Sequence, residues 1–263
     1  MPEVTMIEAV RLAMKEEMER DETVVIIGED VGAYGGAFKA TDGLYKQFGE
    51  YRVIDTPISE SAIVGVALGM AITGFRPVAE IQFADFITCG FDMIVNQTAT
   101  LRYRTANDMH APMVIRAPSA AGVHGGLYHS QSPEAWFAHT PGVKVIVPSS
   151  AYDAKGLLKA AIRDEDPVVF LEPKYLYRRA KDDVPDEEYI VPIGKAKVLQ
   201  EGADVSLITY GTMVNLCRNA IQTLEEEEGL SIELIDLRTI MPLDKETIYT
   251  SVRKTNRAVL VYE

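Results

Sequence analysis

The sequence predicts an α/β fold in which a parallel sheet is covered by helices on both faces and is followed by a second, smaller α/β unit. Short continuous apolar runs alternate with segments of helical periodicity, which is typical of strands that are buried on both faces. The same alternation restarts after a polar stretch near residue 186, and this restart indicates two units. With 263 residues, 47% of them hydrophobic, the chain is long enough to bury a sizeable core.

The first unit is expected to begin with a helix from about Thr5 to Arg20. Thr5 and Glu8 have the spacing of a capping box, in which two side chains satisfy free backbone N–H groups at a helix start. Ile7 and Val10 begin an apolar stripe on one helical face. Five apolar runs then predict strands, at Val24 to Ile27, Val78 to Phe83, Met113 to Arg116, Val143 to Val147 and Val168 to Leu171.

A polar segment from Lys181 to Pro192 separates the two units. Its acidic residues and prolines contribute little to a core, so we expect a linker there, between a first domain of residues 1–180 and a second of residues 193–263. The acidic run Glu225 to Glu228 ends a helix of the second domain and is interpreted as a solvated face. That domain should contain strands Val205 to Thr209, Ser231 to Leu237 and Ala258 to Tyr262, with helices Thr212 to about Glu227 and Leu243 to Val252.

The composition argues against several classes of function. The excess of 39 Asp and Glu over 26 Lys and Arg disfavours binding to nucleic acid or to an anionic membrane surface. The apolar stretch from Ala62 to Thr73 is shorter than the ~20 residues of a membrane span and is expected to be a buried helix. Cys89 and Cys217 lack metal or redox spacing, so we interpret both as packed small hydrophobes in a reducing compartment. The first residues lack the pattern of an export signal, which predicts a cytoplasmic protein.

Loops that follow predicted strands are candidates for chemistry, because open α/β sheets bind ligands beyond the carboxyl ends of their strands. Three such loops span residues 55–60, 80–86 and 122–134. In the first, Glu60 opens a helix in which Gly65 and Gly69 lie one turn apart, so a ligand or another backbone can approach closely. Taken alone, Glu60 is best explained as a first-turn acid that complements the helix dipole.

The other two loops carry aromatic side chains and a histidine. From spacing alone, Phe83 and Phe86 are better explained as plain core residues. Ser132 is expected to cap a short helix that begins at Pro133, which leaves His129 in the loop before it. A histidine there is either merely solvated or suited to proton exchange near neutral pH, and the pattern alone leaves both interpretations open.

Five ordered motifs resemble the β subunits of thiamin diphosphate-dependent 2-oxo acid dehydrogenases, over the whole chain. They are Ile27-Gly28-Glu29-Asp30-Val31-Gly32, Asp55-Thr56-Pro57-Ile58-Ser59-Glu60, Gln82-Phe83-Ala84-Asp85, Tyr128-His129-Ser130-Gln131-Ser132-Pro133-Glu134-Ala135 and Ile235-Asp236-Leu237-Arg238-Thr239. The resemblance implies a transketolase-like pyrimidine-binding domain followed by a transketolase C-terminal-like domain, the latter incomplete because family members continue beyond Glu263.

The resemblance also implies partners. Two such chains would join two α subunits in a heterotetramer that transfers its acyl group to a lipoyl-bearing dihydrolipoyl acyltransferase core. The α subunit would hold the cofactor diphosphate and magnesium. This agrees with the absence from the sequence of a Gly-Asp-Gly segment followed by Asn, a Gly-x-Gly-x-x-Gly fingerprint and a phosphate-binding Lys loop.

Site roles follow from matching the motifs. Glu60 would share a proton with the N1′ nitrogen of the aminopyrimidine ring and so promote formation of the attacking ylid. Phe86 would stack on that ring, and Ile58 and Gln82 would complete the pocket. His129 would donate a proton as the acyl unit passes to the lipoyl group.

The resemblance further implies a potassium site and a preferred class of substrate. Some family members bind potassium on this subunit, and the matching positions are Met113, Ala161, Ile162, Asp164 and Asp166. Asp166 stands where some relatives carry Asn, and it keeps an oxygen ligand available. The motifs at residues 82–85 and 128–134 resemble branched-chain enzymes more than pyruvate enzymes, so branched-chain 2-oxo acids are expected, with pyruvate or acetoin as alternatives.

Two rival hypotheses remain to be compared. A single-chain transketolase or deoxyxylulose phosphate synthase would carry its own diphosphate site, which this sequence lacks. A non-catalytic binding module of the same fold would be expected to have replaced Glu60 or His129, and both are present. We therefore expect an enzyme subunit that is inactive without its α partner.

Overall fold

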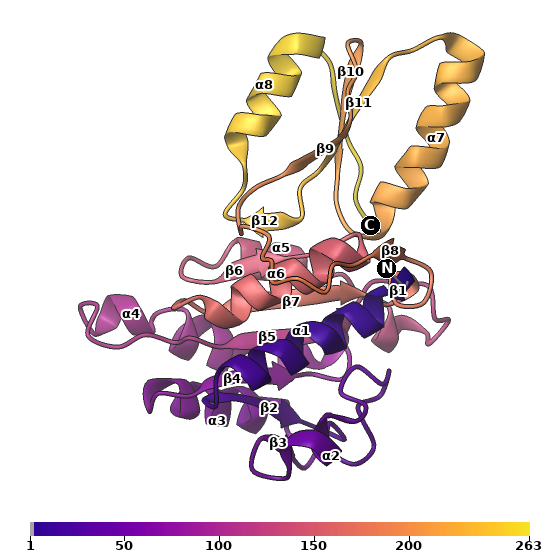
Figure 1. Cartoon of the computed structure of the whole chain (residues 1–263). Helices are drawn as coiled ribbons and strands as arrows, with labels where there is room; N and C mark the ends of the chain where they lie inside the picture. The colour runs from indigo at the N-terminus through magenta and orange to yellow at the C-terminus, as the bar shows by residue number, and fades with distance from the viewer. Residues whose placement is uncertain (1–2) are drawn as a thin grey trace.

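The computed structural model describes residues 3–263 and contains two stacked units, each built around a largely parallel sheet (Figure 1). This confirms the α/β fold class expected from the sequence. Met1 and Pro2, the start of the segment in which we expected no export signal, lie outside the described residues. Within residues 3–263, no helix combines the length and apolarity needed to cross a membrane.

The larger unit holds a seven-stranded sheet in the order β12-β6-β7-β5-β4-β2-β3. Six strands are parallel and β12 is antiparallel to β6. The strands are β2 (Val24–Gly28), β3 (Val53–Asp55), β4 (Arg76–Glu80), β5 (Val114–Ser119), β6 (Lys144–Ile146), β7 (Val168–Pro173) and β12 (Thr239–Met241). The sequence predicted five of these, and it missed the three-residue strands β3 and β12.

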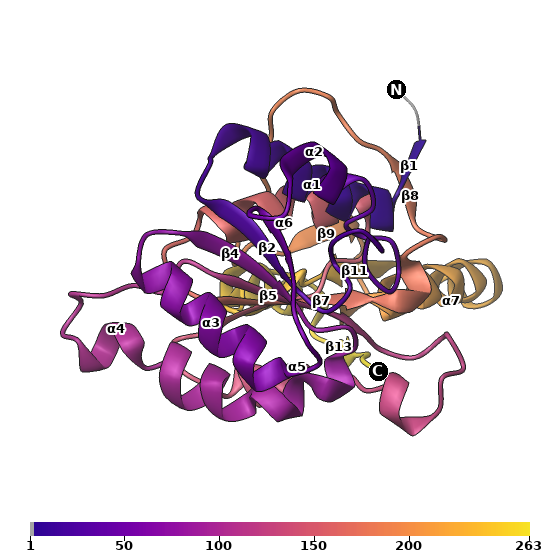
Figure 2. The ribbon, with the colours of Figure 1, turned by 90° about the horizontal axis from the view of Figure 1, so that it is seen from below.

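Helices cover both faces of this sheet (Figure 2). Along β7, Val168 and Phe170 enter one core while Val169 and Leu171 enter the other, which is why the strand is continuously apolar. One face carries α1 (Met6–Arg20), α2 (Leu44–Phe48) and α6 (Ala151–Arg163). The other carries α3 (Glu60–Ile72), the 3-10 helix η1 (Ala84–Gly90), the π-helix η2 (Met93–Thr98) and α5 (Glu134–Ala138), with α4 (Leu101–Arg104) following η2.

The polar segment after residue 180 is packed more closely than its composition predicts. It begins with β8 (Lys181–Asp183), which pairs antiparallel with β1 (Glu3–Thr5). Val184 and Val191 are buried in the first core, so the expectation that the segment contributes little to a core is wrong. Gly156 of α6 makes room, because a Cβ there would lie 2.5 Å from Val191 Cγ2.

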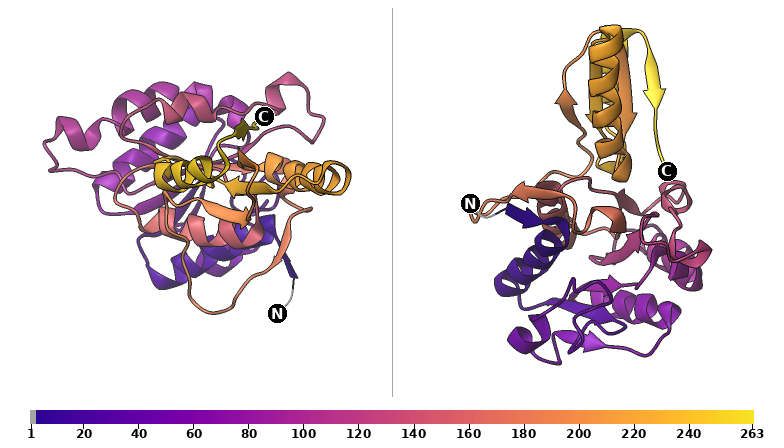
Figure 3. Two further views of the ribbon diagram at one scale, coloured as in Figure 1. Left: turned by 90° about the horizontal axis from the view of Figure 1, so that it is seen from above. Right: turned by 90° about the vertical axis from the view of Figure 1, so that its right-hand side faces the viewer.

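The smaller unit projects from the larger one (Figure 3) and is built on a sheet of order β13-β10-β11-β9. Helices α7 (Thr212–Glu228) and α8 (Lys245–Thr255) lie on opposite sides of it (Figure 1). Its strands are β9 (Lys197–Gln200), β10 (Val205–Thr209), β11 (Ile232–Asp236) and β13 (Ala258–Leu260). The run Glu225 to Glu228 is exposed at the end of α7, as expected for a solvated face.

The segment after β11 ties the two units together, because β12 returns to the edge of the larger sheet. Arg238 Nη1 lies 2.8 Å from Asp153 Oδ1 on α6. The hydroxyl of Ser149 donates to the buried carboxylate of Asp236. The motif from Ile235 to Thr239 is therefore a joint between the units.

Two local expectations are wrong. The helix expected to be buried is α3, and one of its faces is solvent-exposed: Val66 is 52% exposed, and a Cβ at Gly69 would meet nothing within 4 Å. The buried apolar positions of α3 pack toward the sheet and on η1 and η2, and a Cβ at Gly65 would lie 3.5 Å from Met93 Cε. Val66 and Gly69 lie on the remaining face, which is open among residues 3–263. Of the two cysteines, Cys217 is buried as expected, but Cys89 is exposed.

Candidate active site

The three candidate loops meet at one edge of the larger sheet. They follow β3, β4 and β5, which run parallel and therefore end on the same side. The 3-10 helix η1 connects them. Its last residue, Gly90, packs on the start of α3, where an added Cβ would lie 3.2 Å from the Glu60 carbonyl oxygen, and its residue Phe86 faces His129.

Glu60 is the first residue of α3 and is half-buried. Its charge, with that of Asp30, contributes to raising the pKa of Glu29, for which burial is the main cause. Three carboxyl groups therefore share this corner. Sequence analysis did not single out Glu29, although its place directly after β2, at the same sheet edge, is the signal that could have found it.

Gln82 and Ile58 lie in the loops that follow β4 and β3. β4 ends at Glu80, so Gln82 and Phe83 lie in the loop rather than in the strand that we expected to reach Phe83. The chain leaves the sheet there because η1 begins at residue 84. Gln82 Nε2 donates to Asp30 Oδ2 at 3.3 Å, while Ile58 is 75% exposed.

Aromatic rings surround His129. Its ring centroid lies 4.4 Å from that of Phe83 and 5.5 Å from that of Phe86, edge-on in both cases. The structure thus brings together Phe86 and His129, two predicted site residues from loops more than forty positions apart. His129 is half-buried at the end of the 3-10 turn η3 (Leu127–His129), and its Nδ1 atom is buried with no hydrogen-bond partner among the described residues.

The helix after this loop starts later than predicted. α5 begins at Glu134 with Pro133 as its N-cap residue and no side-chain cap, so Ser132 does not cap it. Pro133 has φ −87° and ψ 16°, outside the helical range. The chain just before it is held instead by Asp85, whose Oδ1 accepts from the backbone N–H groups of Ser130 and Gln131.

A buried ionic network forms the floor of the site. Arg116 is fully buried on β5, and its guanidinium pairs with Glu80 of β4 and Glu172 of β7. The hydroxyl of Tyr177 also donates to Glu172. Burial raises the pKa of Glu80 against the opposing charge of Arg116. These strands end where the candidate loops begin, so the network fixes their relative positions.

The carbonyl groups matched to potassium already have donors. Arg76 Nη1 donates to the carbonyl oxygens of Ile162 and Asp164, at 3.2 and 3.1 Å. The carbonyl oxygens of Met113 and Ala161 accept backbone N–H groups at 3.0 and 3.2 Å.

The carboxylates of the same set are also paired with cations. Lys144 Nζ lies 2.6 Å from Asp164 Oδ1 and 3.6 Å from Asp166 Oδ2, and Arg102 Nε lies 2.8 Å from Asp166 Oδ1. In this arrangement the five residues do not fit a potassium ion, because two guanidinium groups, one ammonium group and backbone N–H groups already hold their oxygen atoms. Within residues 3–263, no cluster of three or more His, Cys, Asp or Glu side chains is arranged to hold a metal ion.

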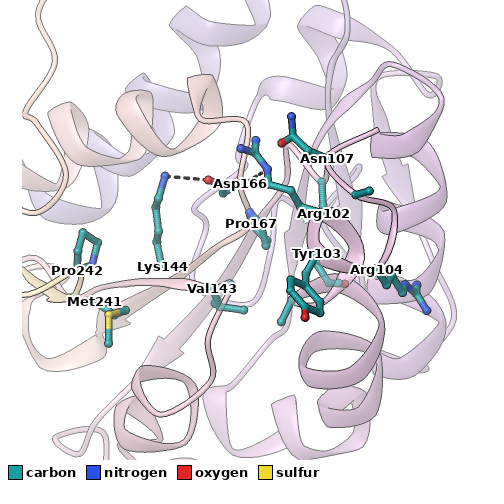
Figure 4. Close-up of a pocket in the computed structure, with 15 residues that line it drawn as sticks. Arg102, Tyr103, Arg104, Asn107, Val143, Lys144, Asp166, Pro167, Met241 and Pro242 are labelled. Carbon is teal, nitrogen blue, oxygen red and sulfur yellow. Dashed lines mark ion pairs between the residues drawn. The ribbon is translucent and has the colours of Figure 1, made fainter. Parts of the chain in front are cut away.

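A cavity of about 1040 Å³ lies at the opposite, amino edge of the same sheet (Figure 4). Arg102, Tyr103 and Asn107 line one side, and Met241 and Pro242 line the other. None of the residues matched to the cofactor lines it. The cavity is therefore separate from the candidate active site.

Two family models match the chain, one for each unit. The transketolase pyrimidine-binding domain matches residues 2–180, and the transketolase C-terminal domain matches residues 194–263. A solved structure described as a split-gene transketolase, an inactive β4 tetramer, resembles the chain with a TM-score of 0.80 at 26% identity. The match covers 99% of this chain and 80% of that one.

Relatives with similar sequences are β subunits of 2-oxoisovalerate dehydrogenase and of pyruvate dehydrogenase. The β subunit of 2-oxoisovalerate dehydrogenase from Bacillus subtilis (strain 168) is 56% identical over 257 residues, which cover 98% of this chain and 78% of the relative. The β subunit of the pyruvate dehydrogenase E1 component from the same strain is 51% identical over 263 residues, covering 100% of this chain and 81% of the relative. The corresponding pyruvate dehydrogenase subunit of Acholeplasma laidlawii is 50% identical over 260 residues, covering 99% and 79%.

Proposed function

Because the chain belongs to the family of β subunits of thiamin diphosphate-dependent 2-oxo acid dehydrogenases, we propose that it supplies the pyrimidine half of a cofactor site that an α subunit completes. The observation that carries the proposal is the position of η1. This helix packs on the start of α3 at Glu60 and, through Phe86, on His129. The three matched residues therefore share one edge of the sheet.

Glu60 is the proposed acid/base group of this chain. Decarboxylation of a 2-oxo acid develops negative charge on the acyl carbon, and thiamin diphosphate, when bound, supplies the electron sink. The carboxyl group of Glu60 would exchange a proton with the N1′ nitrogen of the pyrimidine ring. Glu29 and Asp30 add negative charge to this corner, which favours a ligand that presents a basic nitrogen.

The remaining pocket residues would orient the ring. Phe86 would stack on it, since aromatic faces pair favourably in partly buried sites. Ile58 offers an exposed apolar side chain, and Gln82 offers an amide beside Asp30. The fit rests on these residues lying in segments at the same edge of the sheet as Glu60.

His129 is the proposed proton donor for the second half of the reaction, in which the acyl group passes to a lipoyl group on a dihydrolipoyl acyltransferase. Its ring is half-buried between Phe83 and Phe86, while residues 122–128 of its loop are exposed. A tethered substrate that arrives from solvent would therefore reach His129 without displacing the core.

The substrate and the assembly are proposed from the relatives. The 2-oxoisovalerate relative is more similar than the pyruvate relatives, at 56% against 50–51% identity, which favours branched-chain 2-oxo acids over pyruvate. We place magnesium and the diphosphate with the α subunit, in a heterotetramer of two α and two β chains. The description of the transketolase neighbour as an inactive β4 tetramer supports inactivity of the β chain by itself.

Glu60→Gln in the enzyme co-purified with its α subunit tests the proposal. Proton exchange at thiazolium C2 should slow by about 10²–10⁴, the usual contribution of a general acid/base group. Glu50→Gln, an exposed carboxyl in a loop, is the matched control and should exchange at the normal rate. A normal rate in a correctly assembled Glu60→Gln enzyme would remove Glu60 from this role.

A further inference from the structure

Asp85 lies directly beneath the loop of His129. It is buried, with 5% exposure, near the start of η1. Its Oδ1 atom accepts hydrogen bonds from the backbone N–H groups of Ser130 at 3.1 Å and Gln131 at 3.2 Å. These are the two residues that follow His129, so the carboxylate holds the chain at the point where the imidazole leaves the backbone.

Most other hydrogen bonds of the loop are local: the Ser130 hydroxyl donates to the Gly126 carbonyl at 2.8 Å, and the Gln131 amide donates to the Leu127 carbonyl at 3.3 Å. Residues 122–128 are exposed, and η3 is a single 3-10 turn. The base of the loop is closed by the Ala120 N–H group, which donates to the Gln131 carbonyl at 2.9 Å. Because hydrogen bonds to a carboxylate are stronger than bonds between neutral groups, Asp85 is a stronger anchor than this backbone bond.

The surroundings show that this carboxylate is built into the site. Lys174, 4% exposed, lies on the other side of the loop base, where its ammonium group donates to the Ala120 carbonyl at 2.6 Å. Burial lowers the pKa of Lys174 to about 8, and the charge of Asp85 opposes that shift. Two buried atoms here have no partner among the described residues: Asp85 Oδ2 and His129 Nδ1.

We propose that Asp85 is a positioning residue for acyl transfer, which fixes the imidazole of His129 between Phe83 and Phe86 by anchoring Ser130 and Gln131. The inference rests on the proposed function, in which His129 is the proton donor of that step. Both side-chain hydrogen bonds of Asp85 go to the loop of His129 and none goes to Glu60. Its loss should therefore affect transfer to the lipoyl group and leave cofactor activation intact.

Two variants of the assembled enzyme separate this role from general stability. Asp85→Asn keeps an oxygen that can accept both N–H groups, whereas Asp85→Ala removes it. Asp85→Ala should lower kcat for acylation of a free lipoyl domain by about 10–100-fold, since a misplacement of 1 Å can cost about 10²-fold, with KM for the lipoyl domain nearly unchanged. For Asp85→Asn, kcat for the same acylation should stay within about threefold of the wild-type value. Asp108→Ala, at an exposed aspartate, is the matched control.

Hydrogen exchange of peptides covering residues 126–133 provides a readout that does not depend on activity. Exchange in Asp85→Ala should be about tenfold faster, as expected for the loss of a bond to a charged acceptor, and Asp85→Asn should resemble the wild type. Unchanged exchange in Asp85→Ala, or equal kinetic losses in both variants, would overturn the proposal. If the wild-type enzyme fails to acylate the lipoyl domain, the proposed function fails, and the exchange comparison still decides the role of Asp85.

Discussion

The buried network around Arg116 allows the effect of one substitution on stability to be estimated. Arg116 Nε and Nη2 each lie 2.7 Å from a carboxylate oxygen of Glu172, and Nη1 pairs with Glu80. Arg116→Met replaces the guanidinium with an apolar side chain and leaves both carboxylates without their only cationic partner in this network. The two acids then face each other across β5, and only the Tyr177 hydroxyl still donates to one of them, Glu172.

Removing one partner of a buried ion pair costs about 3–5 kcal/mol. At about 2–4 °C per kcal/mol for a chain of this size, the melting temperature should fall by roughly 6–20 °C. The measurement is thermal unfolding followed by circular dichroism, on the wild type and on Arg116→Met side by side. Arg253→Met is the matched control, because Arg253 is exposed on α8, and its melting temperature should stay within about 2 °C.

A second comparison separates the effect of the two unpaired carboxylates from the loss of the Arg116 side chain. Combining Arg116→Met with Glu80→Gln and Glu172→Gln removes the unpaired carboxylates and should recover part of the lost stability. A melting temperature of Arg116→Met within the range of the control would show that the network contributes little. In that case our account of how the strand ends are held would be wrong.

Three further results are expected. His129→Ala should slow acylation of a lipoyl domain by about 10²–10⁴ and leave thiazolium C2 exchange nearly normal; equal losses in both assays would contradict the separate roles of His129 and Glu60. Burial raises the pKa of Asp236 from 3.8 to about 7, so its contribution to stability is lost as the pH rises from about 4 to 7; Asp236→Asn should flatten the melting temperature over that window, and parallel profiles would refute this. Potassium chloride, compared with sodium chloride at equal ionic strength, should raise the melting temperature of Arg76→Met more than that of the wild type, because the substitution frees the carbonyl oxygens of Ile162 and Asp164; identical responses would show that competition with Arg76 is not what excludes potassium from these positions.

The sequence predicted the parts of the fold that depend on local pattern. Strands such as β7 are recognisable because both of their faces are buried, which makes them continuously apolar. The helix at residues 6–20 begins where the capping box predicted, and the Thr5 N–H group donates to Glu8 Oε2 at 2.9 Å. The placement of three candidate loops at one sheet edge also followed, since parallel strands end on the same side.

Long-range contacts could not be predicted in this way. Nothing in the local pattern indicates that Asp85 binds Ser130 and Gln131, which lie 45 and 46 residues further along the chain. The same holds for Val184 and Val191, whose acidic neighbours conceal their burial. The potassium positions were matched one by one, but the guanidinium that competes for them comes from β4, far away in the sequence.

The central claim is that this chain holds only the pyrimidine half of the cofactor site. The most direct test measures decarboxylation of 3-methyl-2-oxobutanoate, with thiamin diphosphate and magnesium present, by the purified chain and by the chain co-purified with an α subunit that carries the Gly-Asp-Gly segment. We expect turnover only when the α subunit is present. Turnover by the chain alone would contradict it.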